Sequence, residues 1–267
     1  MTTIATEQAL RFERVTGNVG AIVQGVPVDG PYTSETATAL QHALHEHGVL
    51  FFEYGEALTA EQFQAFSALF GEPEERYGLK SGTEGQTIDN DRVPMAEYRT
   101  NTWHSDGTLF ERPPQAAMLT PVEVPETGGD TMWASMYAAW ESLSSYYQRL
   151  LESVEVLHSA AGLPFLKDAP TAVHPAVIRD AVTNRQMLFV NSAYTERILD
   201  MSDRESASLL AMLYDHINTP EFHVRLRWRL GTVAVWEERV TQHRGVADVV
   251  GARKLRRLTF AGDRPTA

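Results

Sequence analysis

The sequence contains no cysteine. This absence excludes disulfide bonds, thiolate metal ligands and a cysteine nucleophile. Any metal that the protein binds must be held by histidine, aspartate or glutamate, and these ligands favour a hard or intermediate metal. The absence of cysteine also favours an intracellular enzyme.

The sequence also lacks a long apolar run. No stretch approaches the roughly 20 apolar residues that a membrane-spanning helix requires. The first residues, Met1 to Gln8, have neither the basic start nor the apolar segment of a signal peptide. These absences predict a soluble, cytoplasmic protein without a membrane partner.

Positive charge is in deficit, with 23 Lys and Arg against 35 Asp and Glu and a net charge of −12. A nucleic-acid backbone is bound by basic surface, so we expect a small-molecule partner and no nucleic acid. The 267 residues contain no repeat and no long linker. They predict a single domain over residues 1–267.

Apolar periodicity predicts several helices and short strands. Two sequences with the pattern of a capping box, at Thr59 and Ser202, predict helix starts. Phe63, Phe66 and Phe70 follow the first of these and are expected in the core. The predicted helices cover 34–47, 59–70, 135–150 and 202–217, and the predicted strands cover 49–52, 224–228 and 232–236.

Residues 81–100 are polar and have no apolar period. They predict a long loop, and loops longer than about 12 to 15 residues are usually functional or disordered. Because this loop leads into Trp103, we expect a substrate-covering lid around residues 76–100 or a mobile insertion.

The tetrapeptide Trp103-His104-Ser105-Asp106 places an imidazole and a carboxylate two residues apart. In an extended backbone these two side chains point the same way. His243 is the candidate for a third ligand. Two histidines and one carboxylate on one face of an ion are typical of a non-haem Fe(II) oxygenase.

Further motifs surround this tetrapeptide. Gly107-Thr108 follows it at once, Arg112-Pro113-Pro114 and Gly128-Gly129-Asp130-Thr131 come next, and arginines follow His243. In this order the motifs resemble the taurine dioxygenase family of Fe(II)- and 2-oxoglutarate-dependent oxygenases, over nearly the whole chain. The resemblance implies a homo-oligomer and a mainly β fold with flanking helices, a double-stranded β-helix or cupin-like jelly roll. Without it, the sequence supports only a mixed, strand-rich core.

The resemblance also implies a reaction. His104, Asp106 and His243 would bind Fe(II), and 2-oxoglutarate and dioxygen would take the remaining positions. The substrate would be a small anionic compound such as an aryloxyalkanoate, a sulfonate or a sulfate ester, hydroxylated with release of succinate and CO2. Halogenating relatives have a small residue in place of the carboxylate, so Asp106 predicts hydroxylation.

Three further residues match binding positions of the family. Thr131 and Arg253 match the pair that binds the distal carboxylate of 2-oxoglutarate. Arg257 matches the position that binds the anionic head group of the substrate, or it supports 2-oxoglutarate from a second side. Arginine suits both tasks because its guanidinium pairs with a carboxylate through two hydrogen bonds.

The chain departs from the family pattern before the distal histidine. Relatives often have Trp-Asp-Asn-Arg where this chain has Trp236-Glu237-Glu238-Arg239. The spacing from His243 to Arg257 is also one residue shorter than expected.

Two other functions remain open from the residues alone. The same triad could hold Zn(II) and activate water for hydrolysis. Alternatively, the protein could be a non-catalytic jelly-roll binding protein in which these residues are structural. Arg253 and Thr131 argue against a hydrolase, which has no reason to bind a dicarboxylate there.

The remaining histidines are expected to be structural. His42, His45 and His47 are predicted on or at the end of a surface helix. None of the other four, which are His158, His174, His216 and His223, has an acidic partner at ligand spacing.

Overall fold

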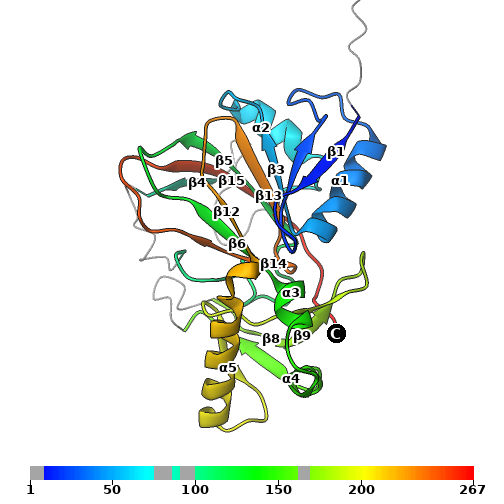
Figure 1. Cartoon of the computed structure of the whole chain (residues 1–267), viewed down its shortest axis with the longest axis vertical. Helices are drawn as coiled ribbons and strands as arrows, with labels where there is room; N and C mark the ends of the chain where they lie inside the picture. The colour runs from blue at the N-terminus through cyan, green and yellow to red at the C-terminus, as the bar shows by residue number, and fades with distance from the viewer. Residues whose placement is uncertain (1–8, 75–85, 91–99, 162–168) are drawn as a thin grey trace, which may run out of the picture.

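The computed structural model of the protein describes residues 9–74, 86–90, 100–161 and 169–267. Over these residues the fold is mainly β, with helices packed around four sheets (Figure 1). The strands are β1 Arg11–Arg14, β2 Ala21–Gln24, β3 Val49–Glu53, β4 Gln86–Asp89, β5 Ala116–Glu123, β6 Thr131–Ser135, β7 Glu155–His158, β8 Ala172–Pro175, β9 Val177–Arg179, β10 Gln186–Leu188, β11 Thr195–Ile198, β12 His223–Leu226, β13 Thr232–Glu237, β14 Thr241–Gly245 and β15 Lys254–Phe260. The helices are α1 Ser34–His47, α2 Ala60–Ser67, α3 Met136–Glu141, α4 Ser145–Leu151, α5 Asp203–Ile217 and the short 3₁₀ helix η2 Pro220–Phe222.

Two sheets face one another and enclose the part of the core that matters for the site. One has the strand order β1-β2-β3-β13-β5-β15-β4, and the other has the order β12-β6-β14. Phe51 and Trp236 from the larger sheet share one buried cluster with Trp133 and Val224 from the smaller sheet. The ring of Trp133 lies 5.5 Å from that of Phe51 and 5.7 Å from that of Trp236. The two sheets are therefore in direct side-chain contact.

Helices α1 and α2 cover the other face of the larger sheet. Leu40 and Leu44 of α1 and Phe63 and Phe66 of α2 pack with Phe52 of β3 in a second cluster. The helix predicted over 34–47 is confirmed, as are the buried strands predicted over 49–52 and 232–236.

Capping groups define the ends of these helices, and the capping box predicted at Thr59 is confirmed. Thr59 and Gln62 form the capping box of α2. Gly48 ends α1 with a φ of 74°, a backbone conformation that glycine adopts without steric cost. Helix α2 ends at Ser67, so the last part of the helix predicted over 59–70 is wrong. Phe70 nevertheless remains buried.

The helix predicted over 135–150 is wrong as a single element. The chain forms α3 and α4 with a break between them. Ser142 Oγ donates to Ala138 O at 2.7 Å, and Ser144 adopts an extended conformation as the N-cap of α4. Serine hydroxyls compete with the helical backbone in this way, whereas the apolar period continues across the break and gives no sign of it.

The helix predicted after Ser202 is confirmed as α5, and its capping box with Glu205 is present. Its buried residues include Leu210, Leu213 and Ile217. The strand predicted over 224–228 is β12, which ends two residues earlier.

The long loop predicted over 81–100 is partly wrong. Gln86–Asp89 form β4, an edge strand paired antiparallel with β15. A polar edge strand has no apolar period, so its pairing partner decides its structure. The rest of the predicted lid, residues 76–85 and 91–99, lies outside the described residues.

None of the helices in the described part of the chain combines the length and the apolar character that crossing a membrane demands.

Candidate metal centre

The backbone brings the predicted ligands together at β14. His104 and His243 form an antiparallel bridge. His104 N donates to His243 O at 3.1 Å, and His243 N donates to His104 O at 2.8 Å. Ser105 Oγ donates to Thr241 O at 2.9 Å and adds a side-chain contact to the bridge. The two imidazole rings consequently lie side by side, with centroids 4.2 Å apart.

The three predicted ligands form a compact cluster. One ligand atom from each of His104, Asp106 and His243 lies within 4.8 Å of the others. Asp106 Oδ1 is 3.7 Å from His104 Nε2, and Asp106 Oδ2 is 3.9 Å from His243 Nε2. Across the described residues, no second group of three His, Asp or Glu residues comes together in this way. This donor set suits Fe(II) and leaves adjacent coordination positions open.

The protonation states of the cluster favour metal binding. Burial lowers the pKa of His104 and holds the pKa of His243 well below its ordinary value. Both rings are thus neutral at pH 7, which is the form that ligates a metal. Burial alone would raise the pKa of Asp106, but the Arg257 guanidinium beside it holds this pKa below its usual range, so this group is a carboxylate.

The orientation of His104 is set by a backbone carbonyl. His104 Nδ1 lies 2.7 Å from Thr102 O. A carbonyl oxygen only accepts, so Nδ1 carries the proton and Nε2 presents its lone pair toward Asp106. Hydrogen bonds of this kind fix the ring orientation of metal-binding histidines.

Glu238 lies behind the cluster. Its Oε2 accepts from Asp106 N at 2.9 Å, and its Oε1 accepts from Trp236 Nε1 at 2.9 Å. Oε2 is also 3.7 Å from His243 Nδ1. Burial, and then the charge of Asp106, raise the pKa of Glu238 well above its ordinary value. Sequence reasoning noted this glutamate as a departure from the family pattern but not its contact with the triad.

Arg257 contacts the cluster directly. Its Nη2 donates to Asp106 Oδ2, and its side chain is mostly buried. The guanidinium approaches from β15 of the larger sheet, whereas His243 belongs to the smaller sheet. The triad therefore lies where the two sheets meet.

Arg253 and Thr131 meet beside the triad, as their predicted shared role requires. Arg253 is buried and donates to Gly129 O at 2.7 Å, to Asn90 Oδ1 at 2.7 Å and to Thr131 Oγ1 at 3.3 Å. Burial lowers the pKa of Arg253 to about 10, so the guanidinium remains charged at neutral pH.

The strand register places Thr131 relative to the triad. On β6, Trp133 is opposite His243 and Thr131 is opposite Gly245. Residues opposite one another, and residues two apart, share a face of a sheet. Thr131 consequently shares a face with His243, about 7 Å farther along the strand.

The structure explains the residue types of the Gly-Gly-Asp-Thr motif. A Cβ at Gly128 would lie 2.1 Å from Asp248 O, and one at Gly129 would lie 2.8 Å from Arg253 Cδ. Asp130 accepts from Arg225 Nε at 2.6 Å. The motif therefore lets the backbone pass close to Arg253 and positions Thr131.

The prediction for His45 is wrong in one respect. It lies on α1, but it is buried, with its Nδ1 2.9 Å from Asp180 Oδ1. Asp180 is distant in the sequence, so no local pattern could indicate this contact. His158 and His174 are also buried, and neither joins the triad.

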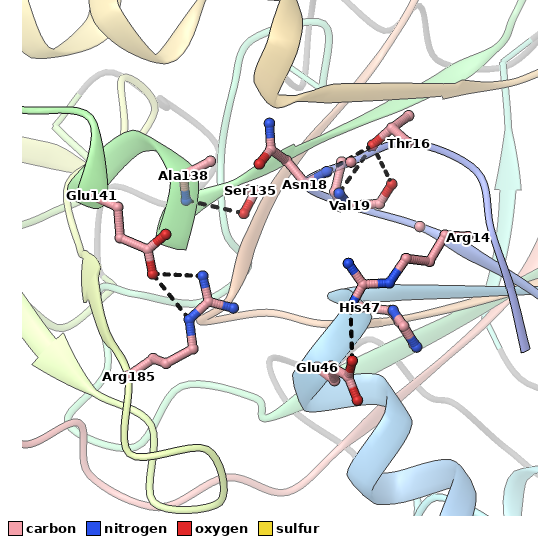
Figure 2. A pocket seen from close by; sticks show the side chains of 12 residues that line it. Arg14, Thr16, Asn18, Val19, Glu46, His47, Ser135, Ala138, Glu141 and Arg185 are labelled. Atoms are coloured by element: carbon pink, nitrogen blue, oxygen red, sulfur yellow. Dashed lines mark hydrogen bonds and ion pairs between the residues drawn. The ribbon is translucent and has the colours of Figure 1, made fainter.

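Two clefts lie away from the ligand atoms. The one in Figure 2, of about 320 Å³, lies between the β1–β2 hairpin, the end of α1 and α3. Its arginines are already paired, Arg14 with Glu46 at 2.8 Å and Arg185 with Glu141 at 2.6 Å. The other, of about 250 Å³, is lined by Trp103, Gln242, Arg244 and their neighbours. Since Trp103, Gln242 and Arg244 are direct neighbours of His104 or His243 in extended segments, their side chains point away from the triad.

Comparison with known proteins points to one family. The family model "Taurine catabolism dioxygenase TauD, TfdA family" matches residues 11–259. The chain is 32% identical over 280 residues to the alpha-ketoglutarate-dependent sulfate ester dioxygenase of Pseudomonas putida, covering 94% of this chain and 89% of that protein. It is 30% identical over 275 residues to the alkylsulfatase of Acinetobacter baylyi, covering 96% and 86%.

A solved structure has the same fold. The structure of AAD-2 in complex with Mn(II) and N-oxalylglycine matches with a TM-score of 0.84 and 26% identity, over 97% of this chain and 100% of that chain.

Proposed function

The chain belongs to the taurine catabolism dioxygenase (TauD, TfdA) family, and from this premise we propose that His104, Asp106 and His243 hold its Fe(II). The protein is an Fe(II)- and 2-oxoglutarate-dependent dioxygenase, an oxidoreductase that also uses dioxygen. The observation that carries the assignment of the ligands is the convergence of two neutral imidazoles and one carboxylate within 4.8 Å. When bound, Fe(II) supplies the oxygen chemistry that converts 2-oxoglutarate to succinate and CO2.

We assign the distal carboxylate of 2-oxoglutarate to Arg253 and Thr131. In the described residues the hydrogen-bond partners of the Arg253 guanidinium are all neutral, and no carboxylate forms an ion pair with it. A buried cation without a counter-ion is costly, and a bound carboxylate removes that cost. The separation of Thr131 from His243 along the sheet is comparable to the length of a five-carbon dicarboxylate.

We assign the anionic head group of the substrate to Arg257. This guanidinium lies against Asp106, and Arg253 lies four residues earlier, about 13 Å along an extended chain. Two arginines so far apart suit two separate anions. An incoming head group would draw Arg257 away from Asp106 and leave that carboxylate to the metal.

The proposed substrate is a small sulfate ester, hydroxylated at the carbon that carries the sulfate oxygen. Two similar relatives are an alkylsulfatase and a sulfate ester dioxygenase. Hydroxylation at this carbon gives a product that breaks into an aldehyde and inorganic sulfate. Sulfonates and aryloxyalkanoates, which the sequence also suggests, are the classes for comparison.

We also propose that the two facing sheets form a double-stranded β-helix of the cupin type and that the chain works as a homo-oligomer. The shared core of the two sheets and the likeness to AAD-2 support the fold.

The test of this function is an anaerobic titration of Fe(II)-loaded protein with 2-oxoglutarate. We expect the weak visible charge-transfer band that a keto acid chelated to Fe(II) produces. The band should be lost in His243→Ala and should need at least tenfold more 2-oxoglutarate in Arg253→Ala. Arg256→Ala is the matched control, because Arg256 is nearby on β15 and its guanidinium instead donates to Leu58 O at 3.2 Å.

In the presence of dioxygen, a sulfate ester should give sulfate, aldehyde and succinate in equal amounts. Sulfate release by Zn(II)-loaded protein without 2-oxoglutarate would instead support the hydrolase. An absent band with fully loaded iron and no turnover would support the binding protein.

A further inference from the structure

We propose that Glu238 is a positioning residue of the metal centre, which holds Asp106 and His243 in their ligating geometry through its buried carboxyl group. This inference rests on the proposed function of the triad. It concerns the residue at which this chain departs from the asparagine that relatives often have.

The first contact joins Glu238 to Asp106. Glu238 Oε2 accepts the backbone N–H of Asp106 at 2.9 Å, although 132 residues separate the two in the sequence. Glu238 is itself held in place, because its N–H donates to Gln115 O at 2.8 Å and its Oε1 accepts from Trp236 Nε1. The backbone of Asp106 is thus tied to a buried group with almost no freedom to move.

The second contact concerns the proton of His243. Nε2 of this ring faces Asp106, so a metal bound there leaves the proton on Nδ1. In the described part of the chain, Nδ1 is buried and has no hydrogen-bond partner. Glu238 Oε2 is 3.7 Å away, and a movement of roughly 0.7 Å would bring the pair to hydrogen-bond distance. Metal-binding histidines usually donate this proton to a carboxylate or carbonyl, which fixes the ring and strengthens it as a ligand.

These contacts suit a carboxyl group better than an amide. Three N–H groups converge on Glu238, from Asp106, Trp236 and His243. Both oxygens of the Glu238 side chain accept hydrogen bonds here, whereas an amide accepts with one oxygen and presents two N–H groups of its own. An amide at position 238 would therefore place a donor against a donor.

The test compares Glu238→Gln with Glu237→Gln. Glu237 is adjacent and equally buried, but its carboxylate accepts from Arg239 and Val240 and, within the described residues, forms no hydrogen bond with the triad. The first readout is the dissociation constant for Mn(II), measured by electron paramagnetic resonance with the metal alone. The second is the melting temperature without metal.

We expect Glu238→Gln to weaken Mn(II) binding by about 10- to 100-fold, the usual effect of losing such a partner. Glu237→Gln should change the Mn(II) constant by less than about threefold, even where it lowers the melting temperature. Equal Mn(II) affinity in wild type and Glu238→Gln would overturn the proposal, as would equal losses in the two variants.

Glu238→Asn provides a second variant should the glutamine protein not fold. It introduces the residue that relatives often have here, and the same loss of at least tenfold is expected. Wild-type affinity in this variant also overturns the proposal. Failure of the proposed function gives a different result, because Fe(II)-loaded wild-type protein would then show no charge-transfer band with 2-oxoglutarate, whatever the Mn(II) constants of the variants.

Discussion

Arg253 and Arg257 are four residues apart in the sequence, yet their surroundings differ. Arg253 donates to Gly129, Thr131 and Asn90 and is buried. Arg257 contacts the carboxylate of Asp106. A guanidinium with only neutral partners is suited to hold an anion permanently in position, whereas one paired with a metal ligand must rearrange when its anion arrives. At the scale of single residues, the two arginines are therefore expected to act on different molecules.

Substitution should separate the two roles. Arg257→Ala should raise the KM for the sulfate ester by at least tenfold, since a hydrogen bond to a charged group contributes roughly 1.5 to 3 kcal/mol. The KM for 2-oxoglutarate should stay within about threefold of the wild-type value. Arg253→Ala should do the reverse. Steady-state kinetics with each substrate varied in turn measures both constants. If both variants raise the same KM, the two arginines bind one molecule and the assignment of Arg257 is wrong.

At the scale of elements, the helices follow local chemistry closely. Thr59 and Ser202 begin α2 and α5 through capping boxes, and Gly48 ends α1. These signals are confined to a few neighbouring residues, so they can be recognised in the sequence. The break between α3 and α4 and the pairing of β4 with β15 depend on competing hydrogen bonds and on a distant strand. Periodicity contains no information about either.

The cap of α5 gives a prediction at this scale. Ser202→Ala removes the hydroxyl that accepts from Glu205 N, and it should lower the free energy of unfolding by about 1 kcal/mol. Chemical denaturation measures the change. Ser208→Ala is the matched control, because Ser208 lies within the same helix and its hydroxyl donates to Arg204 O without capping anything. Equal losses in both variants would contradict the role of the cap.

At the scale of the whole molecule, the buried contact between His45 and Asp180 joins two parts of the structure that pack around different clusters of the core. His45 of α1 meets Asp180, which lies between β9 and β10 and also accepts from Tyr137 Oη at 2.5 Å. Helix α1 packs on the larger sheet, whereas Tyr137 belongs to the cluster that includes α5. The pair therefore ties the two halves of the core together.

This pair makes stability depend on pH. Burial alone would lower the pKa of His45, but Asp180 and Glu237 raise it above its ordinary value. A histidine whose pKa is raised by folding adds stability that is fully present below about pH 6.5 and lost as the pH rises through the folded-state pKa. The difference in melting temperature between wild type and His45→Gln should therefore shrink between pH 6 and pH 8.5. A difference that is constant or grows over this range would contradict a charged His45.

The comparison of variants is necessary because other histidines act in the opposite sense. Burial lowers the pKa values of His104, His158, His174 and His243, so each of these groups costs stability as the pH falls below its unfolded-state value. Their contributions cancel in the difference between wild type and His45→Gln.

The sequence by itself determined which side chains are candidates for the site. It indicated His104, Asp106 and His243 by residue type, because metal binding demands particular side chains and the absence of cysteine leaves few alternatives, and it indicated Thr131 and Arg253 through the resemblance to the family. It also determined most helix starts, since caps are local.

Only the tertiary structure decided which groups surround those residues. Glu238 approaches Asp106 and His243 because β13 turns back into β14 beside the 104–106 segment, and His45 is buried because α1 packs near Asp180. Such contacts join residues far apart in the chain, and their partners are selected by strand register and by packing between layers. That selection is a property of the folded molecule as a whole and leaves no pattern in any short stretch of sequence.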